Sequence, residues 1–495
     1  MKTLYRTLFC TLLATLTVQF VGCGAADIQS AKLYRARRDY TTADKMLQKA
    51  IAEDGTTDEG WFLYISNLYD LKEYEKIATN IDTAMLYSTT HRAELQVYKH
   101  NTWTQLYMGG YGAYNANPDS KEAQHTAIGY LESAQKLEPE QPLTYELLGN
   151  IYYASGDTAK GIENYVAEIN QVSASYDQGV ALGLMVKMPT EAAERAIGGA
   201  PARKFVAPMG NDSSLVYVYP SKQAYIYFEK STKAPFPWLL SGWRIGATEA
   251  EGNQPLAVST SPYEVVANDY YQKGLALLAK GNKSAATTQF DKAVPLLMTL
   301  QQLDPSDEFA AQAIPDIYTR LERTDKAKAE YDRILAEHPS RAMYISYGTL
   351  LMKAQDYAGS INAYQKALAL KPDDEAALFD LAAAYKNWAA ADQKAGKKTE
   401  YKDELDKSSE YFEKLHAINK NDAAVLENLA ENYDILGKKD KSLSLISEFE
   451  ALKGTDIANS ADYWEWLAKL YARANRSADS EAAYKKADAI KQSHK

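Results

Sequence analysis

Cysteine is almost absent from this chain: the 495 residues include two, Cys10 and Cys23, both near the start. An internal disulfide framework and a metal centre built on several cysteines are therefore excluded for the rest of the chain. Histidine is scarce too, with six residues, and no two of them stand four apart as in a helical metal pair. No nucleophile elbow or phosphate-binding loop is found either. We therefore expect no catalytic residue, no metal site and no cofactor.

The chain also lacks a surplus of basic residues. Lysine and arginine total 55 against 65 aspartates and glutamates, which gives a net charge of −10. A chain cut after residue 22 would lose Lys2 and Arg6 and carry 53 − 65 = −12. A mildly acidic protein without a basic stripe is a poor ligand for a phosphate backbone, so we expect no nucleic-acid partner.

A long apolar segment occurs at the N-terminus. Residues 1–6 are basic, and residues 7–21 are apolar but too few to span a membrane comfortably. This arrangement is typical of a secretory signal peptide. The segment ends in Phe20-Val21-Gly22-Cys23-Gly24.

This ending resembles the lipobox of a bacterial lipoprotein. The resemblance implies that residues 1–22 are removed and that Cys23 becomes the lipid-modified first residue. Because Gly24 rather than aspartate follows the cysteine, it also implies delivery to the outer membrane, facing the periplasm or the cell surface. The alternative is an ordinary signal peptide in which Cys23 has no special role.

The clearest pattern lies in residues 363–385, AYQKALALKPDDEAALFDLAAAY. A large aromatic residue, Tyr364, is followed three residues later by small Ala367, and Pro372 then ends the helix. Residues three and four apart share one helix face, and a small residue lets two helices approach. Prolines that end such segments recur at 305, 339 and 372. The pattern resembles the tetratricopeptide repeat (TPR), a helix–turn–helix unit of about 34 residues.

About ten degenerate copies of this pattern predict two helical arrays, residues 23–176 and 263–495. Within the first array, the glycines and asparagines of residues 109–118 predict a loop. Within the second, roughly 14 extra residues around 388–406 predict two lengthened helices.

The helical pattern breaks between the arrays, in residues 177–262. Eight of the 16 prolines fall between Pro189 and Pro262, too many for a regular helix array. Residues 215–219 and 223–229 flank Pro220-Ser221-Lys222 and predict a β-hairpin, and residues 238–246 predict a third strand. We therefore expect an all-α, TPR-type solenoid in two arrays, interrupted by a small β-containing insert. The insert would either set the angle between the arrays or bind a ligand or partner.

The resemblance implies that a concave groove is lined by the first, or front, helix of each pair. Seven positions match the groove-facing pattern: Phe62, Tyr69, Tyr153, Glu427, Glu431, Asp434 and Glu465. The last four are acidic, and an acidic stripe suits a basic or neutral partner. The alternative is an ordinary solvated acidic face.

These features favour a lipid-anchored cell-envelope scaffold that binds a peptide or helix of a protein partner and catalyses nothing itself. Such a scaffold could serve the assembly of a membrane or surface complex. The alternative is a surface lipoprotein that binds a glycan or nutrient. In that case the aromatic residues of the insert would stack on sugar rings, and the candidates are Tyr217, Tyr225, Trp238 and Trp243.

Overall fold

The computed structural model describes residues 23–209, 212–231, 237–252, 257–397, 399–420, 422–451 and 456–493. The predicted leader, residues 1–22, lies outside the described residues. Cys23, the first described residue, already lies in helix α2 (Cys23–Ala36). No linker therefore separates the predicted lipid-bearing residue from the helical array that follows it.

The chain divides into two compact units, Met1–Pro305 and Ser306–Lys495. The helices of the first unit are α2 (Cys23–Ala36), α3 (Tyr40–Glu53), α4 (Asp58–Asp70), α5 (Tyr74–Tyr87), α6 (Arg92–Ala116), α7 (Lys121–Leu137), α8 (Pro142–Ala154), α9 (Thr158–Ala181), α10 (Thr190–Ile197), α11 (Glu249–Gly252), α12 (Ser261–Ala279) and α13 (Lys283–Leu303). Those of the second unit are α14 (Glu308–Arg320), α15 (Thr324–Glu337), α16 (Arg341–Lys353), α17 (Tyr357–Leu370), α18 (Glu375–Lys394), α19 (Glu400–Ile418), α20 (Ala423–Ile435), α21 (Lys439–Ala451), α22 (Ala461–Arg473) and α23 (Ser477–Ser493). Two short 3-10 helices are η1 (Pro220–Lys222) and η3 (Asp456–Asn459). The division after Pro305 lies 43 residues beyond the sequence-based boundary at 262, since α12 and α13 group with the first unit.

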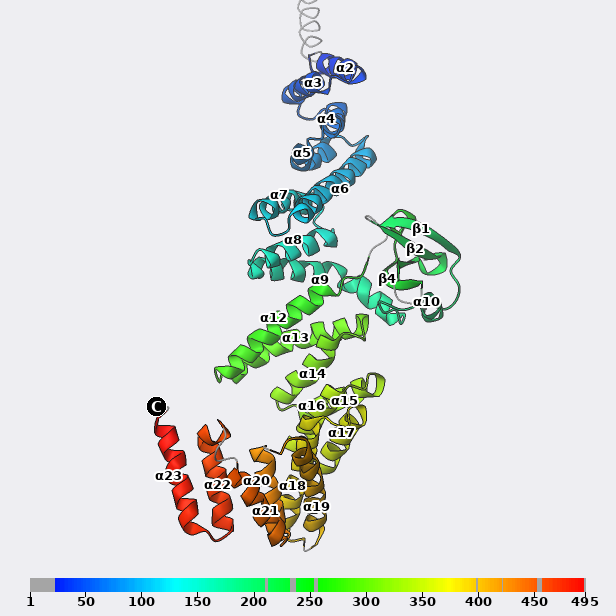
Figure 1. Ribbon diagram of the computed structural model, residues 1–495. Coiled ribbons are helices and arrows are strands. Elements are labelled where there is room, and N and C mark those ends of the chain that lie inside the picture. Colours follow the sequence, from blue (N-terminus) through cyan, green and yellow to red (C-terminus); the bar gives the residue numbers. More distant parts are fainter. Residues whose placement is uncertain are drawn as a thin grey trace, which may run out of the picture. The chain divides into compact units, whose positions relative to one another are not determined.

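Each unit is built from pairs of a front helix and a back helix stacked in chain order (Figure 1). The solenoid with a small β insert is thus confirmed as the fold class. One local prediction is wrong: residues 109–116 are not a loop but the end of the long helix α6. A Cβ on Gly110 would lie 2.6 Å from the Leu131 side chain, so glycine serves close helix packing there rather than a turn.

The two helices of most pairs are joined by a three-residue turn whose middle residue is left-handed. These middle residues, with φ between 58° and 90°, are Arg38, Lys72, Gly156, Gly281, Glu322, Gln355, Gly437 and Asn475. Three are glycine, for which this conformation carries no Cβ clash. Because the same turn recurs, the chain reverses its direction in the same way in each of these helix pairs.

Large side chains of the back helices pack against glycines of the front helices. In the fourth pair, a Cβ on Gly149 would lie 2.7 Å from the ring of Tyr165. The same relation joins Gly348 to Tyr364, at 2.6 Å. Tyr364 is 3% exposed, so its ring has no room to move away. This glycine–aromatic contact is the physical basis of the small-and-large pattern in the sequence.

The insert is a four-stranded antiparallel sheet in the order β1 (Arg203–Met209), β2 (Asp212–Tyr219), β3 (Ala224–Lys230), β4 (Trp238–Ile245). The predicted hairpin is confirmed by the β2–β3 pairing, and the third strand by β4. Strand β1 was not predicted, since Pro208 removes a backbone donor. A proline is tolerated there because β1 is an edge strand.

The sheet is fastened to the first array through Trp243 on β4, which is fully buried. Its indole N–H donates to the carbonyl oxygen of Ser175 on α9, with an N–O distance of 3.0 Å. A Cβ on Gly179 would lie 1.9 Å from that nitrogen, so only glycine admits the ring. Figure 1 shows the sheet beside α9 and α10.

The segment leading into the sheet also reaches the end of α13. The N–H of Val186 donates to the carbonyl of Leu303 at 2.9 Å, and the Lys187 ammonium pairs with Asp304. Since α9 also packs directly on α12, the insert braces the fourth and fifth helix pairs. This supports the interpretation that it fixes the geometry between successive pairs.

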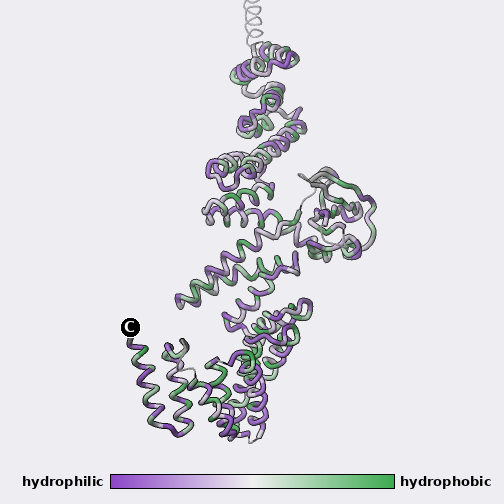
Figure 2. Tube along the Cα trace, viewed as in Figure 1, coloured by the Kyte–Doolittle hydropathy of each residue, from purple (hydrophilic) through white to green (hydrophobic). Residues whose placement is uncertain are grey.

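The predicted lengthening of the eighth pair is confirmed: α18 has 20 residues and α19 has 19. Among the residues described, no helix combines the length and hydropathy needed to cross a bilayer. Figure 2 shows hydrophilic and hydrophobic residues alternating along the helices, as expected for helices that bury one side.

Candidate functional site

Two of the predicted groove residues, Phe62 and Tyr69, lie on α4 and meet the ring of Tyr98 on α6. The Tyr69 and Tyr98 ring centres are 5.3 Å apart with an interplanar angle of 60°, and those of Phe62 and Tyr98 are 6.4 Å apart. Phe62 also stacks on His91, at 4.1 Å and 13°. All are partly exposed, so the junction of α4 and α6 presents aromatic edges to solvent.

A polar chain runs beneath these rings. The Arg35 guanidinium donates to the Ser66 hydroxyl and to the Asp70 carboxylate, both at 2.8 Å. The Ser66 hydroxyl lies 2.9 Å from the Tyr98 hydroxyl. Because Arg35 is paired with Asp70, this junction carries no net charge from that pair.

Tyr153, the third predicted groove residue, lies on α8 and is 43% exposed. About two turns earlier on the same helix, Glu146 is mostly covered instead. The hydroxyl of Ser259, from the segment that precedes α12, lies 2.6 Å from its Oε1. The chain itself therefore covers part of the front-helix face in the fourth pair.

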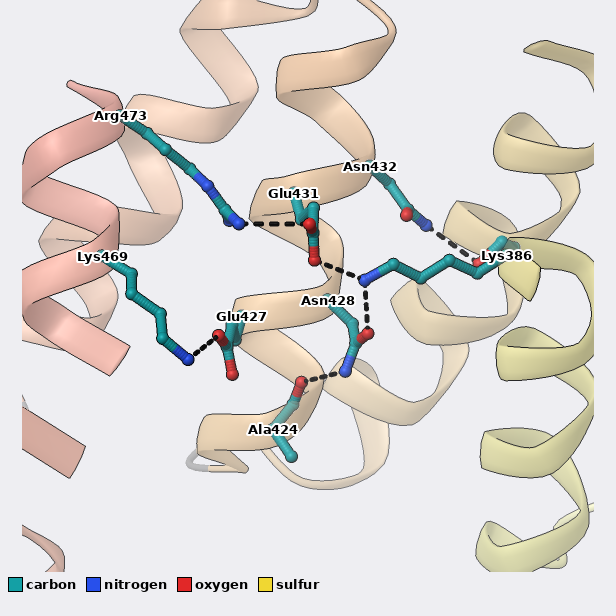
Figure 3. A network of polar contacts seen from close by, with 9 residues as sticks. Lys386, Ala424, Glu427, Asn428, Glu431, Asn432, Lys469 and Arg473 are labelled. Carbon is teal, nitrogen blue, oxygen red and sulfur yellow. Dashed lines mark hydrogen bonds and ion pairs between the residues drawn. The ribbon is translucent and has the colours of Figure 1, made fainter. Parts of the chain in front are cut away.

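Two of the predicted acidic residues of the second unit, Glu427 and Glu431, lie in a network of opposite charges (Figure 3). Glu431 on α20 pairs with Lys386 on α18 at 2.6 Å and with Arg473 on α22 at 3.2 Å. Glu427 pairs with Lys469 on α22 at 3.4 Å. We call Lys386, Glu427, Asn428, Glu431, Lys469 and Arg473 the charged network.

The network links three successive front helices. The Lys386 ammonium donates to the Asn428 amide oxygen at 2.7 Å, and the Asn428 amide N–H donates to the Ala424 carbonyl at 2.8 Å. Burial alone would raise the pKa of Glu431. The hydrogen bond from Lys386 and the charges of Lys386 and Arg473 outweigh it and hold the pKa below its usual value. Glu431 is therefore ionised and fixed in place at neutral pH.

The remaining two predicted residues lie at the margins of this network. Glu465 on α22 pairs with Lys491 of α23 at 2.6 Å, and that hydrogen bond lowers the pKa of Glu465. Asp434 lines a recess of about 390 Å³ together with Lys439, Leu443 and Arg473. Its Oδ2 atom is buried without a hydrogen-bond partner.

These ion pairs change the charge that the sequence predicted for the acidic stripe of candidate groove residues. The carboxylates of Glu427, Glu431 and Glu465 are each matched by a lysine or arginine, so a partner meets a mixed-charge surface instead of a purely acidic one. That these residues line a partner-binding groove stays a prediction.

The lysines and arginine of the charged network were not predicted from the sequence. Lys469 and Arg473 each follow their glutamate by 42 residues. Equivalent leucines of the two pairs, Leu429 and Leu467, are 38 residues apart. The ion pairs of Lys469 and Arg473 therefore join positions one repeat plus one helical turn apart, and that offset would have identified them in the sequence.

The insert does not offer the sugar-stacking surface proposed for it. Tyr217, Tyr225 and Trp243 are 5%, 7% and 0% exposed, and of the four candidates only Trp238 is partly accessible. Three buried rings provide no platform for a sugar. Their burial argues against glycan binding by these rings.

In the described ranges, no group of three or more histidine, cysteine, aspartate or glutamate side chains is arranged to hold a metal ion. The surface carries aromatic edges in the first unit and fixed charges of both signs in the second, and both kinds of group can contact a partner.

Residues 348–387 match the protein family described as TPR repeat. Among solved structures, PilF of Pseudomonas aeruginosa is 19% identical, with 45% of this chain and 90% of that chain covered and a TM-score of 0.31. YrrB, described as a TPR protein with an unusual peptide-binding site, is 16% identical, with 40% and 93% covered and a TM-score of 0.30. MamA of MSR-1 is 15% identical, with 37% and 97% covered and a TM-score of 0.28. None of the curated proteins matches the chain. The family match places a TPR repeat in the second unit, where it includes Lys386 of the charged network. Such repeats form scaffolds that present surfaces to protein partners.

Proposed function

We propose that this chain is a lipid-anchored scaffold of the bacterial cell envelope that binds protein partners through the front helices of its two units. The charged network carries the proposal. Six side chains from three successive repeats are held in fixed positions by ion pairs and, for Asn428, hydrogen bonds, and the network's carboxylates and ammonium groups remain partly exposed.

Such a surface suits a protein partner for two reasons. Charges that are already fixed lose little side-chain entropy on binding, so preorganisation favours affinity. Charges of both signs in a set pattern select a partner with the complementary pattern and disfavour others. Because the front helices belong to consecutive repeats, the pattern extends over a length that a peptide or helix can follow.

The test is a cross-linked capture from native membranes with three forms of the full-length protein. Arg473→Glu places a second carboxylate against Glu431 and should reduce capture of the partner by about tenfold. Lys485→Glu is the matched control, since Lys485 is an exposed, ion-paired cation on the back helix α23. Equal capture by both variants, or no protein captured by the wild type, would contradict the proposal.

We place the anchor at Cys23 and the protein at the outer membrane, facing the periplasm or the surface. The support is the lipobox-like ending of the leader and Gly24 after the cysteine. A thioether-linked lipid with a further acyl chain would hold the protein stably, because a single chain is marginal.

Labelling cells with a clickable fatty acid tests the anchor. We expect label in the wild type and in Cys10→Ser, and none in Cys23→Ser, because Cys10 and Cys23 are the only cysteines. Fractionation of the same cells should place the labelled protein in the outer membrane. Label that persists in Cys23→Ser would show that the anchor is elsewhere.

A further inference from the structure

The first helix pair is the positively charged end of a negatively charged chain. Residues 23–53, which comprise α2 and α3, contain six lysines and arginines and four aspartates and glutamates, a net charge of +2. Of the 53 basic and 65 acidic residues after the leader, 47 and 61 remain for residues 54–495, a net charge of −14. Such an uneven distribution indicates that the first pair meets a more negative surface than the rest of the chain does.

Three of the six basic side chains of this pair are available to such a surface. Arg37, Arg38 and Lys45 are exposed, and no ion pair or hydrogen bond joins their side chains to any described residue. The other three form salt bridges with carboxylates of α2 and α4. Asp39, which lies among the free cations, accepts a hydrogen bond from the backbone N–H of Thr42 as the N-cap of α3.

The outward side of α2 is uncharged up to these arginines, and it includes Leu33, which is 62% exposed. The exposed residues before Arg37 are Ala25, Ala26, Gln29, Leu33 and Ala36. The last described helix, α23, presents charges to water, as expected for the end of a helical array. Its exposed charged residues include Glu481, Lys485, Lys486, Asp488 and Lys491. Helix α2 therefore lacks the charged outer side of a solvated end.

The position of Leu33 relative to Cys23 distinguishes two orientations of α2 on a membrane. Both residues lie on this helix, ten residues apart, which corresponds to about 15 Å. A helix perpendicular to the membrane would hold Leu33 about that far from a lipid-bearing Cys23. A helix parallel to the membrane would instead place Leu33 and Arg37 at the same depth as the lipid attachment.

We propose that α2 lies flat on the membrane, with Leu33 in the interface and Arg37, Arg38 and Lys45 against the anionic phosphate groups of the lipids. This rests on the anchor at Cys23 proposed above and names a second contact with the same membrane. The lipid keeps the first pair at the surface, so modest attractions act at a high local concentration. Basic residues near an anionic surface are attracted within a Debye length, and a basic patch complements a lipid chain.

The negative charge of the remaining chain supports this orientation. Residues 54–495, at −14, are repelled by the same phosphate groups that attract the first pair. The membrane contact is therefore confined to the first pair, and the later repeats stay available to protein partners.

The test places an environment-sensitive fluorescent label at position 33 of the full-length protein. If residues 1–22 are removed and Cys23 carries the lipid, the new cysteine of Leu33→Cys is the only free thiol. Leu86→Cys is the matched control, since Leu86 is 63% exposed on α5 of the same unit. Both proteins are reconstituted in vesicles of phosphatidylethanolamine with a minority of phosphatidylglycerol. Iodide then reports exposure to water, and spin-labelled lipids report contact with the bilayer.

We expect iodide to quench the label at position 33 at least about fivefold less than at position 86, and the spin-labelled lipids to quench only position 33. Phosphatidylcholine vesicles, or about 500 mM salt, should reduce this difference by at least about twofold, because the attraction of the arginines is then missing or screened.

Reversing the charge of the turn after α2 tests the electrostatic part. Arg37→Glu combined with Arg38→Glu should restore iodide quenching of position 33 to the level of position 86. Glutamate fits this turn, since Glu322 adopts the left-handed conformation of Arg38 in another pair, with φ of 58° against 62°. Lys485→Glu combined with Lys486→Glu, adjacent and exposed on α23, is the control and should leave the shielding unchanged.

Equal iodide quenching at positions 33 and 86 in the anionic vesicles would overturn the flat-helix proposal. Shielding without quenching by spin-labelled lipids would also overturn it, because protein instead of lipid would then cover α2. The same holds for shielding that survives the two arginine substitutions. Fatty-acid labelling of Cys23 tests the anchor separately. A labelled protein with position 33 exposed refutes only the flat helix, whereas an unlabelled one refutes the anchor and the flat helix together.

Discussion

Trp243→Ala should lower the free energy of unfolding of the first unit by about 3–5 kcal/mol. The ring is fully buried where β4 meets α9, so its removal leaves a cavity between the insert and the array. The carbonyl of Ser175 also loses its donor, which adds an unpaired acceptor at the same place. Tyr176, whose ring packs edge-on at 6.2 Å from Trp243, would lose a neighbour as well.

The measurement is pulse proteolysis in increasing urea, with fragments of the two units distinguished by mass spectrometry. Trp238→Ala, on the same strand but only partly buried, is the control and should cost about 1 kcal/mol. If the two variants lose the same stability, the insert is not fastened through Trp243. The brace between the fourth and fifth helix pairs would then need another explanation.

The first unit should become less stable as the pH rises from about 5 to about 8, and Glu168 on α9 should account for about 3–4 kcal/mol of that loss. This carboxyl is 2% exposed, and its Oε2 has no hydrogen-bond partner. Burial, with repulsion from Glu146, raises the pKa of Glu168 to about 9. Its ionisable neighbours are Tyr107, Glu146, Tyr165, Tyr176 and Tyr263.

The direction of this pH dependence follows from the number of protons that the folded and unfolded states bind. In the folded protein Glu168 keeps its proton up to about pH 9, whereas in the unfolded chain it loses the proton above its ordinary pKa of 4.5. The unfolded state therefore binds fewer protons across this window, and the free energy of unfolding falls as the pH rises. Below the ordinary pKa the group is protonated in both states, and the penalty disappears.

Glu168→Gln should remove this part of the pH dependence. The buried amide adds a fixed cost of about 1–3 kcal/mol at every pH, so the slope, not the absolute stability, is the readout. Urea unfolding at several pH values, again read by fragments of the first unit, gives that slope. Glu163→Gln, exposed on the same helix, should leave the slope unchanged. A wild-type slope that survives in Glu168→Gln would mean that Glu168 is ionised in the folded protein.

The repeats were predictable because their packing rule is local. The contact of Gly348 with Tyr364 spans 16 residues, and its small-and-large pattern recurs along the chain. Turn chemistry, in contrast, misled for residues 109–116, where glycines and asparagines indicated a loop. Gly110 instead admits Leu131, and a sequence does not distinguish a glycine needed for packing from one needed for a turn.

The candidate site was less predictable because its contacts join different repeats. Arg473 reaches Glu431 only because the stacking offsets one front helix against the next by a turn. The burial of Trp243 could not be predicted from an alternation of apolar and polar residues along the strands either. Residues 224–228 of the neighbouring strand β3 are buried on both faces, so the period of two that separates inside from outside is lost.

The most direct measurement is photo-crosslinking in living cells from single positions on the second unit. A photoreactive residue in place of Lys469, on the front helix α22, is compared with one in place of Lys485, on the back helix α23. Both lysines are exposed and ion-paired, and the two probes project from different faces. The proposed scaffold function predicts a discrete crosslinked protein from position 469 and none from position 485. Equal crosslinking from both positions, or none from position 469, would contradict it.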